Sequence, residues 1–222
     1  MDIIDKLTEI FKEFPGIGER QARRFVYYLM RRNGNYAANF TKLVGELKKE
    51  TLQCEECFRF FLVRNTPPPG LPLAKGEVPK AKGVLKSAVC EICADPHADS
   101  TVLMILEKDS DLESVKKSGA YRGKYFLLGG LVPLVEKDTK KFVRIEELKD
   151  RLKKDKNIKE VILAFSLNPH GDHTDHYVRS EIKNLPEVKN IKISSLGRGL
   201  STGTELEYSD NDTLRNALKN RQ

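Results

Sequence analysis

The sequence predicts an α+β protein with several domains, and three observations carry this prediction. The first fifty residues show only helical periodicity, four cysteines form two C-x-x-C pairs, and beyond residue 100 short apolar runs alternate with amphipathic segments. We therefore expect a helical N-terminal domain over 1–53, a four-cysteine zinc finger over 54–99, an α/β domain with a mostly parallel sheet over 100–196, and a closing strand–helix segment over 197–222.

The composition indicates a globular protein of the cytoplasm. Hydrophobic residues make up 39% of the 222 residues, and no apolar run approaches the ~20 residues that a membrane span requires. The N-terminal segment is amphipathic and contains acids, unlike a secretory signal. The net charge of +7 favours a polyanionic partner only modestly, because many proteins without one are equally basic. We expect no contact with membranes.

Three helices are predicted in the first fifty residues, separated by the turns Pro15–Gly18 and Asn33–Gly34. The first turn and its flanking helices form a helix–hairpin–helix pattern. Its glycines allow the backbone to approach another surface closely, and the free N–H groups at the start of the second helix suit a phosphate.

Three arginines follow this turn at once. Arg20 and Arg24 are four residues apart and share a helical face, so they could hold a nucleic-acid backbone without recognising bases. The alternative is an ordinary helix pair with a solvated basic face, and Glu19 would repel a phosphate. The predicted DNA-binding residues are Gly16, Gly18, Arg20, Arg23 and Arg24.

All four cysteines of the chain lie in the two pairs, at Cys54, Cys57, Cys90 and Cys93. In a reducing cytoplasm this pattern favours one structural, closed, tetrahedral Zn²⁺ site per chain. Two exposed dithiols or a redox pair are the alternatives. The basic, proline-rich residues 58–89 between the pairs are predicted to be a mostly irregular insertion. Its role is open: a solvated loop, a DNA contact or a protein-docking segment.

The remainder of the chain alternates predicted strands and helices, as expected for a parallel sheet. Strands are expected at 101–106, 125–128, 161–165 and 191–194, helices at 111–118, 145–152 and 172–183, and a final strand and helix at 205–208 and 210–219.

The strand ends are where an α/β sheet would carry catalytic groups. Glu107 follows the first strand, but Ser166 and Asn168 follow the third, and neutral side chains bind magnesium poorly. We therefore predict that the chain is not an enzyme. Two alternatives stay open: a nuclease or topoisomerase with Glu107 as its metal-binding acid, and a metallohydrolase built on the histidines of 170–176. A simpler explanation for Asp172 and Asp175 is the dipole of a helix N-terminus.

The order of these features resembles the RecR family of bacterial recombination mediators. The matching stretches are Phe14–Gly18 with Arg20 and Arg24, Cys90–Asp99, Leu106–Glu107, Leu112–Gly123, Asn168–Pro169, Gly197–Leu200, Gly203 and Leu206–Tyr208. The sequence departs from the family in the long span between the cysteine pairs, in the loop after Pro133 and in the segment after Pro169.

The resemblance implies a Toprim fold for the α/β domain and a nucleoid-associated homotetramer that forms a ring on double-stranded and gapped DNA. It implies partners of the RecO or RecF type, with which the protein loads recombinase at gaps during DNA repair. The DNA-contacting positions of the family fall on Arg20 and Arg24. The Toprim domain would present a partner surface rather than a catalytic centre, and its candidate residues are Glu107, Asn168 and Asp172.

Overall fold

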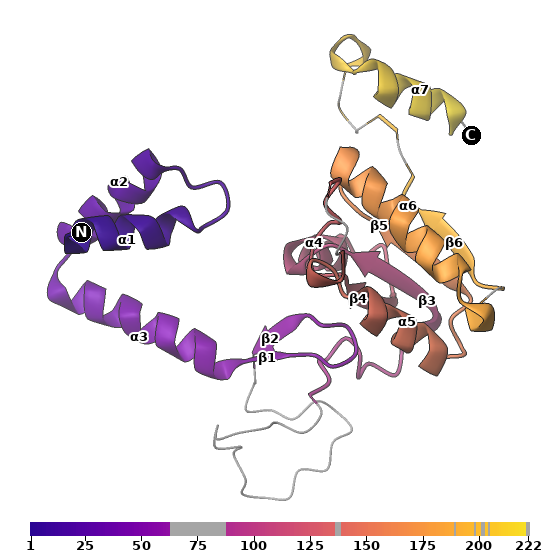
Figure 1. Ribbon diagram of the computed structural model, residues 1–222, viewed down its shortest axis with the longest axis horizontal. Helices are drawn as coiled ribbons and strands as arrows, with labels where there is room; N and C mark the ends of the chain where they lie inside the picture. Colours follow the sequence, from indigo (N-terminus) through magenta and orange to yellow (C-terminus); the bar gives the residue numbers. More distant parts are fainter. Residues whose placement is uncertain are drawn as a thin grey trace, which may run out of the picture. The chain divides into compact units, whose positions relative to one another are not determined.

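The computed structural model divides into two units, Met1–Thr51 and Leu52–Gln222 (Figure 1). The structure describes residues 1–62, 88–135, 139–188, 190–197, 199–200, 203 and 205–220. The sequence-based prediction of a mixed α and β fold is confirmed: helices make up the first unit, and the second contains a parallel sheet and the cysteine cluster.

The first unit consists of the helices α1 (Ile3–Lys12), α2 (Glu19–Met30) and α3 (Gly34–Glu50). Asp2 caps α1 in a capping box, and Asn33 caps α3 by accepting a hydrogen bond from the Tyr36 amide. Helices α1 and α2 pack on each other, but they bury only three of their side chains. Every residue of α3 is described, and none is buried.

The second unit begins with a cysteine knuckle. Strands β1 (Thr51–Gln53) and β2 (Phe60–Leu62) form a small two-stranded sheet on either side of the first cysteine pair. The predicted irregular insertion therefore began too early, because residues 60–62 pair with β1 and Arg59 is buried. Residues 63–87 of that insertion lie outside the described part of the chain.

The predicted parallel sheet is confirmed, with the strand order β4-β3-β5-β6 and parallel pairing throughout. Its strands and the helices between them lie within four residues of the predicted bounds. In chain order they are β3 (Asp99–Leu106), α4 (Asp109–Ser118), β4 (Gly123–Leu127), the 3-10 turn η1 (Thr139–Lys141), α5 (Ile145–Lys154), β5 (Glu160–Ala164), α6 (Pro169–Lys183), the 3-10 turn η2 (Pro186–Val188) and β6 (Lys192–Ser195).

Successive side chains on a strand point to opposite faces of the sheet, and here both faces are covered. On β3, Leu103 and Ile105 join a core with residues of α5 and α6. Met104 and Leu106 point the other way, into a second core that α4 and the four cysteines share. The cysteine knuckle thus packs against the sheet as part of its second covering layer.

The predicted strand at 205–208 was wrong. Residues Leu206–Tyr208 form the 3-10 turn η3, followed by the predicted helix as α7 (Asn211–Lys219). The amides of Tyr208 and Ser209 donate to the carbonyls of Glu205 and Leu206, at 3.1 Å each. No described strand pairs with this segment, so local hydrogen bonds satisfy its backbone instead.

Among the described residues, no helix combines the length and the apolar composition that crossing a bilayer requires.

Candidate nucleic-acid interface and metal centre

The hairpin of the first unit leaves backbone N–H groups free at the start of α2. Gly16 has φ +76°, a left-handed conformation that favours glycine, and the Ile17 amide closes the turn on the Phe14 carbonyl at 3.0 Å. Gly18 is the N-cap of α2 and has no side chain with which to cap the helix. The first amides of α2 are therefore available to an external acceptor, as anion sites at helix N-termini require.

The three predicted arginines differ in their surroundings. Arg23 lies 3.7 Å from Asp5 and 3.9 Å from Glu19, so carboxylates already offset its charge. Within the described residues, neither Arg20 nor Arg24 has a carboxylate partner, and both are exposed on α2. These two guanidinium groups are thus the ones ready to meet a phosphate. The roles of all five predicted DNA-binding residues stay predictions.

The four cysteines converge into one cluster. Their sulfur atoms all lie within 4.8 Å of one another, and the Cys57 and Cys90 sulfurs are 3.6 Å apart. A tetrahedral zinc with Zn–S bonds of about 2.3 Å needs sulfurs about 3.8 Å apart. All four residues are buried, so the dimensions and the donor set both fit a closed metal site.

The ionisation of these thiols also favours a bound cation. Hydrogen bonds from the other three sulfurs, Cys57 first, lower the pKa of the Cys54 thiol. Hydrogen bonding with Cys54 raises the pKa of Cys57 and of Cys93. Four crowded, buried thiols cannot all lose their protons unless a metal balances the charge.

Two arginines lie beside this cluster and were not predicted from the sequence. Arg59 is only 8% exposed, and its guanidinium bridges Glu91 at 3.1 Å and Glu113 at 3.0 Å. Arg151 on α5 binds Glu56 at 2.9 Å. Burial opposes the charge of both, yet nearby carboxylates and cysteine sulfurs raise their pKa values. A divalent ion with four thiolates would carry two net negative charges, and the electrostatic attraction between these arginines and the cysteines would stabilise that charge in part, because carboxylates share both guanidinium groups.

Hydrogen bonds attach the knuckle to strand β4. The Leu127 amide donates to the Cys57 carbonyl at 2.9 Å. The Lys124 ammonium donates to the carbonyls of Cys93 at 2.8 Å and Asp95 at 3.2 Å. The Phe58 ring packs edge-on against Phe126, with centroids 5.4 Å apart. The metal site and the sheet therefore form one structural body.

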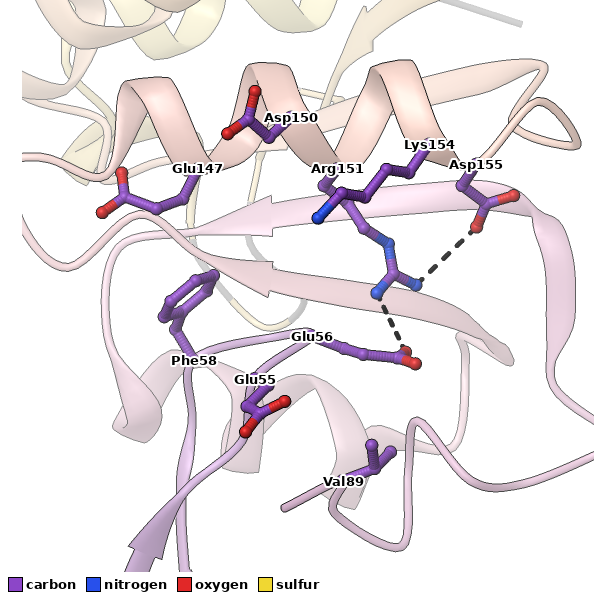
Figure 2. Close-up of a pocket in the computed structure, with 9 residues that line it drawn as sticks. All are labelled: Glu55, Glu56, Phe58, Val89, Glu147, Asp150, Arg151, Lys154 and Asp155. Carbon is purple, nitrogen blue, oxygen red and sulfur yellow. Dashed lines mark ion pairs between the residues drawn. The ribbon is translucent and has the colours of Figure 1, made fainter. Parts of the chain in front are cut away.

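A pocket of about 550 Å³ lies between the knuckle and α5 (Figure 2). Figure 2 shows the Arg151 guanidinium held between Glu56 and Asp155, with ion pairs to both. Carboxylates dominate the wall; the lining residues are Glu55, Glu56, Phe58, Val89, Glu147, Asp150, Arg151, Lys154 and Asp155. This excess of negative charge would repel a phosphate backbone, so DNA does not bind favourably here.

The ends of the neighbouring strands β3 and β5 bring Glu107 and Ser166 together. The Ser166 hydroxyl donates to the Glu107 carboxylate at 3.2 Å, and Lys108 pairs with Glu107 at 3.7 Å. The Asn168 side chain accepts from the Gly171 amide at 2.8 Å and so caps α6. Asp172 lies in the first turn of that helix. The partner-surface role of Glu107, Asn168 and Asp172 stays a prediction.

Histidines 170, 173 and 176 all lie on α6, in its first two turns. Within the described residues, the cysteine cluster is the only group of three or more His, Cys, Asp or Glu side chains close enough to hold a metal. Asp175 instead pairs with Arg179 at 3.2 Å, and the Ser195 hydroxyl donates to it at 2.6 Å. The arrangement around α6 therefore gives a hydrolytic metal centre no support.

This fold and these sites define a Toprim-domain protein with a cluster of four buried cysteines that could hold a metal ion. The Toprim domain family matches residues 102–196, and the family described as "RecR, C-terminal" matches residues 199–222. A "Recombination protein RecR" from Dehalococcoides mccartyi is 31% identical over 219 residues, which cover 99% of this chain and 93% of that protein. The protein of that name from Lactobacillus acidophilus is 29% identical over 218 residues, covering 98% and 96%. The chain belongs to the RecR family.

Proposed function

We propose that this chain is a non-enzymatic DNA-binding protein of recombinational repair, and that the hairpin of its first unit holds the phosphate backbone. One observation carries the proposal: the start of α2, which has no side-chain cap, occurs in one helical unit with Arg20 and Arg24, which have no carboxylate partner among the described residues. The relatives named as recombination proteins supply the context of repair. Contacts of this kind give affinity without base recognition, which suits a protein that acts at DNA gaps of any sequence.

Zinc is the metal that we propose for the cysteine cluster, with a structural role. Four thiolates fill a tetrahedral shell and leave no open position for substrate or water. Cys54, Cys57, Cys90 and Cys93 would hold the ion, and the ion would secure the knuckle against the sheet. Chemistry at this centre is therefore not part of the proposed function.

The exposed apolar side of α3 supports a proposal of self-association. Phe40, Leu43, Val44 and Leu47 are 42–57% exposed although they recur at helical spacing. An apolar stripe of this kind is normally covered. We propose that a second copy of the chain covers it, within a homotetrameric ring on DNA, and that RecO- or RecF-like proteins dock on the Toprim domain near Glu107, Asn168 and Asp172.

The absence of catalysis is inferred from the strand ends. Glu107 is held by Ser166 and Lys108, and the Asp109 carboxylate accepts from the Phe60 amide at 2.8 Å. These groups already have protein partners, and no carboxylate cluster accompanies them in the described part of the chain. If the purified protein nicked plasmid DNA in magnesium and Glu107→Gln abolished the nicking, the nuclease alternative would replace this proposal.

The DNA-binding proposal is tested with the double variant Arg20→Ala/Arg24→Ala. Fluorescence anisotropy with duplex DNA should show binding at least about tenfold weaker, and the salt slope should fall by about two. Lys116→Ala/Lys117→Ala on α4 removes the same charge from the second unit and should change the affinity little. Arg23→Ala should have a smaller effect than Arg24→Ala, since Asp5 and Glu19 already offset Arg23. Equal affinities for the Arg20/Arg24 variant and the unmodified chain would refute the assignment.

A further inference from the structure

A basic and aromatic stripe continues along α2 beyond the hairpin. Residues spaced i, i+4, i+7, i+8 and i+11 share one side of a helix. On α2 and its C-cap these positions are Arg20, Arg24, Tyr27, Tyr28 and Arg31, and all five are exposed. The opposite side carries Ala22 and Val26, which are buried against α1. The stripe is about 16 Å long at 1.5 Å per residue.

An aromatic cluster lies at the end of this stripe, where α2 passes into α3. The Arg32 guanidinium is 4.4 Å from the centre of the Tyr28 ring and 5.4 Å from that of Tyr36. It also donates a hydrogen bond to the Tyr28 hydroxyl, and this bond lowers the pKa of Tyr28. The two rings meet edge to face, with centroids 6.2 Å apart.

The sequence positions this cluster through a helix cap. The Asn33 side chain accepts from the Tyr36 amide at 2.9 Å and so begins α3 at Gly34, four residues after α2 ends at Met30. Tyr28 and Tyr36 are therefore fixed relative to each other by two helices of one unit. Both remain exposed, at 46% and 41%.

Two exposed rings held by Arg32, on the same helical unit as the exposed Arg24 and Arg31, have the chemistry of a single-stranded nucleic-acid site. Such sites combine aromatic faces, on which bases stack, with cations that follow the backbone. Duplex DNA keeps its bases stacked inside the helix, so its bases cannot use these rings. The polar groups on the stripe are all cationic or hydroxylic, which suits a polyanion.

We propose that Tyr28 and Tyr36 form a stacking site for the bases of single-stranded DNA, with Arg24 and Arg31 contacting the adjoining phosphates. The site rests on the proposed DNA-binding function and refines it. The hairpin would hold the backbone at one end of the stripe, and the unpaired bases of a gap would stack at the other. One exposed side of a single unit could then contact both the phosphates and the unstacked strand.

The test compares Tyr28→Ala/Tyr36→Ala with the unmodified chain on three labelled probes: oligo(dT), an abasic oligonucleotide of the same length, and a blunt duplex. Anisotropy should show at least about tenfold weaker binding of oligo(dT), with affinities for the abasic strand and the duplex unchanged within about twofold. Tyr28→Phe/Tyr36→Phe keeps the rings and should retain the affinity for oligo(dT). Tyr208→Ala removes an exposed ring from the second unit and should also leave it unchanged.

A second measurement uses the lack of tryptophan in the chain. Tyr28→Trp gives a single tryptophan, which can be excited selectively over the tyrosines, and its emission should be quenched by oligo(dT) but not by the abasic strand. In the control Tyr208→Trp, oligo(dT) should leave the emission unchanged.

Any of three results would overturn the stacking site. The alanine variant could bind oligo(dT) as tightly as the unmodified chain does, or it could lose as much affinity for the abasic strand as for oligo(dT). It could also show a lower mass by light scattering, so that lost self-association explains the weaker binding. If the unmodified chain bound none of the probes, the DNA-binding function itself would fail. If Arg20→Ala/Arg24→Ala weakened duplex binding while the tyrosine variants changed nothing, only the stacking site would fail.

Discussion

The two units of this chain bury their side chains to very different extents. In the second unit, both faces of the sheet are packed, and the cysteines belong to one of the two cores. In the first, α1 and α2 bury only Thr8, Ala22 and Val26, while α3 buries nothing. A helical unit of about fifty residues with so small a core is marginal by itself. The comparison separates a unit with two packed cores from a unit whose helices leave most of their side chains exposed.

Metal removal should have the largest effect, and it should fall on the second unit. Cys54→Ala/Cys90→Ala should lose one zinc per chain and destabilise the knuckle and sheet by several kcal/mol, because metal binding and folding are coupled in such sites. Metal analysis and hydrogen exchange measure both effects. His173→Ala should keep its zinc. Hydrogen exchange in α1 and α2 should not change when the metal is removed. An unchanged unfolding midpoint in the metal-free protein would contradict a core shared by the cysteines and the sheet.

A pair of leucine variants compares the two units directly. Leu148 is fully buried against the sheet, so Leu148→Ala should cost about 2–5 kcal/mol in urea unfolding. Leu43 is 54% exposed, and Leu43→Ala should change monomer stability by less than about 0.5 kcal/mol. Light scattering should nevertheless show weaker self-association for Leu43→Ala. Equal unfolding costs for the two variants would remove the distinction between the units.

Two glycines should respond in opposite directions. A Cβ on Gly171 would lie 1.8 Å from the Ser166 carbonyl oxygen, so Gly171→Ala must displace the start of α6 and should cost about 1–3 kcal/mol. Gly45, inside α3, has open space around its Cβ position, and Gly45→Ala should stabilise that helix by about 0.5–1 kcal/mol. Thermal unfolding distinguishes the two. If Gly171→Ala stabilised the protein, the close approach of Gly171 to the Ser166 carbonyl would be contradicted.

The smallest effect is expected at the cap of α7. The Thr213 hydroxyl and amide, at 2.7 and 2.9 Å, donate to the Asp210 carboxylate and lower its pKa. A lowered pKa stabilises the folded state above the unfolded value near pH 4, and this contribution is lost as the pH falls through the folded value. The protection factors of the α7 amides, which correct for the intrinsic exchange rate at each pH, should therefore fall on acidification. Asp210→Asn should remove that pH dependence while retaining the cap.

The sheet and the hairpin could be predicted from the sequence because local patterns determine them. Apolar runs of strand length and helical periodicity gave β3 to β6 and α4 to α6 within four residues, and the turns at 15–18 and 33–34 divided the first fifty residues into α1, α2 and α3. The cysteine spacing predicted a cluster that the fold assembles across 32 intervening residues. The apolar and helical patterns depend on neighbouring residues, and the metal-site prediction depends on cysteine, a residue type with few other uses.

What the sequence did not reveal depends on contacts between distant residues. Arg59 and Arg151 are ordinary basic residues until folding places them beside the cysteines. The segment at 205–208 alternates like a strand, but a strand needs a neighbour, and η3 forms where none is described. The Tyr28–Arg32–Tyr36 cluster joins two helices through a cap, so no single periodicity marks it, although aromatic and basic residues at helical spacing were a visible sign.

The attachment of the knuckle to β4 has a consequence for solubility. β4 is an edge strand, and an exposed strand edge can pair with another chain and start aggregation. The Leu127 amide donates a hydrogen bond to the Cys57 carbonyl, and the Lys124 ammonium donates to the carbonyls of Cys93 and Asp95. The knuckle thus shields part of the β4 edge as long as the knuckle stays folded. Removing the metal should therefore expose this edge of β4, and the metal-free protein should aggregate more readily than the metal-bound one.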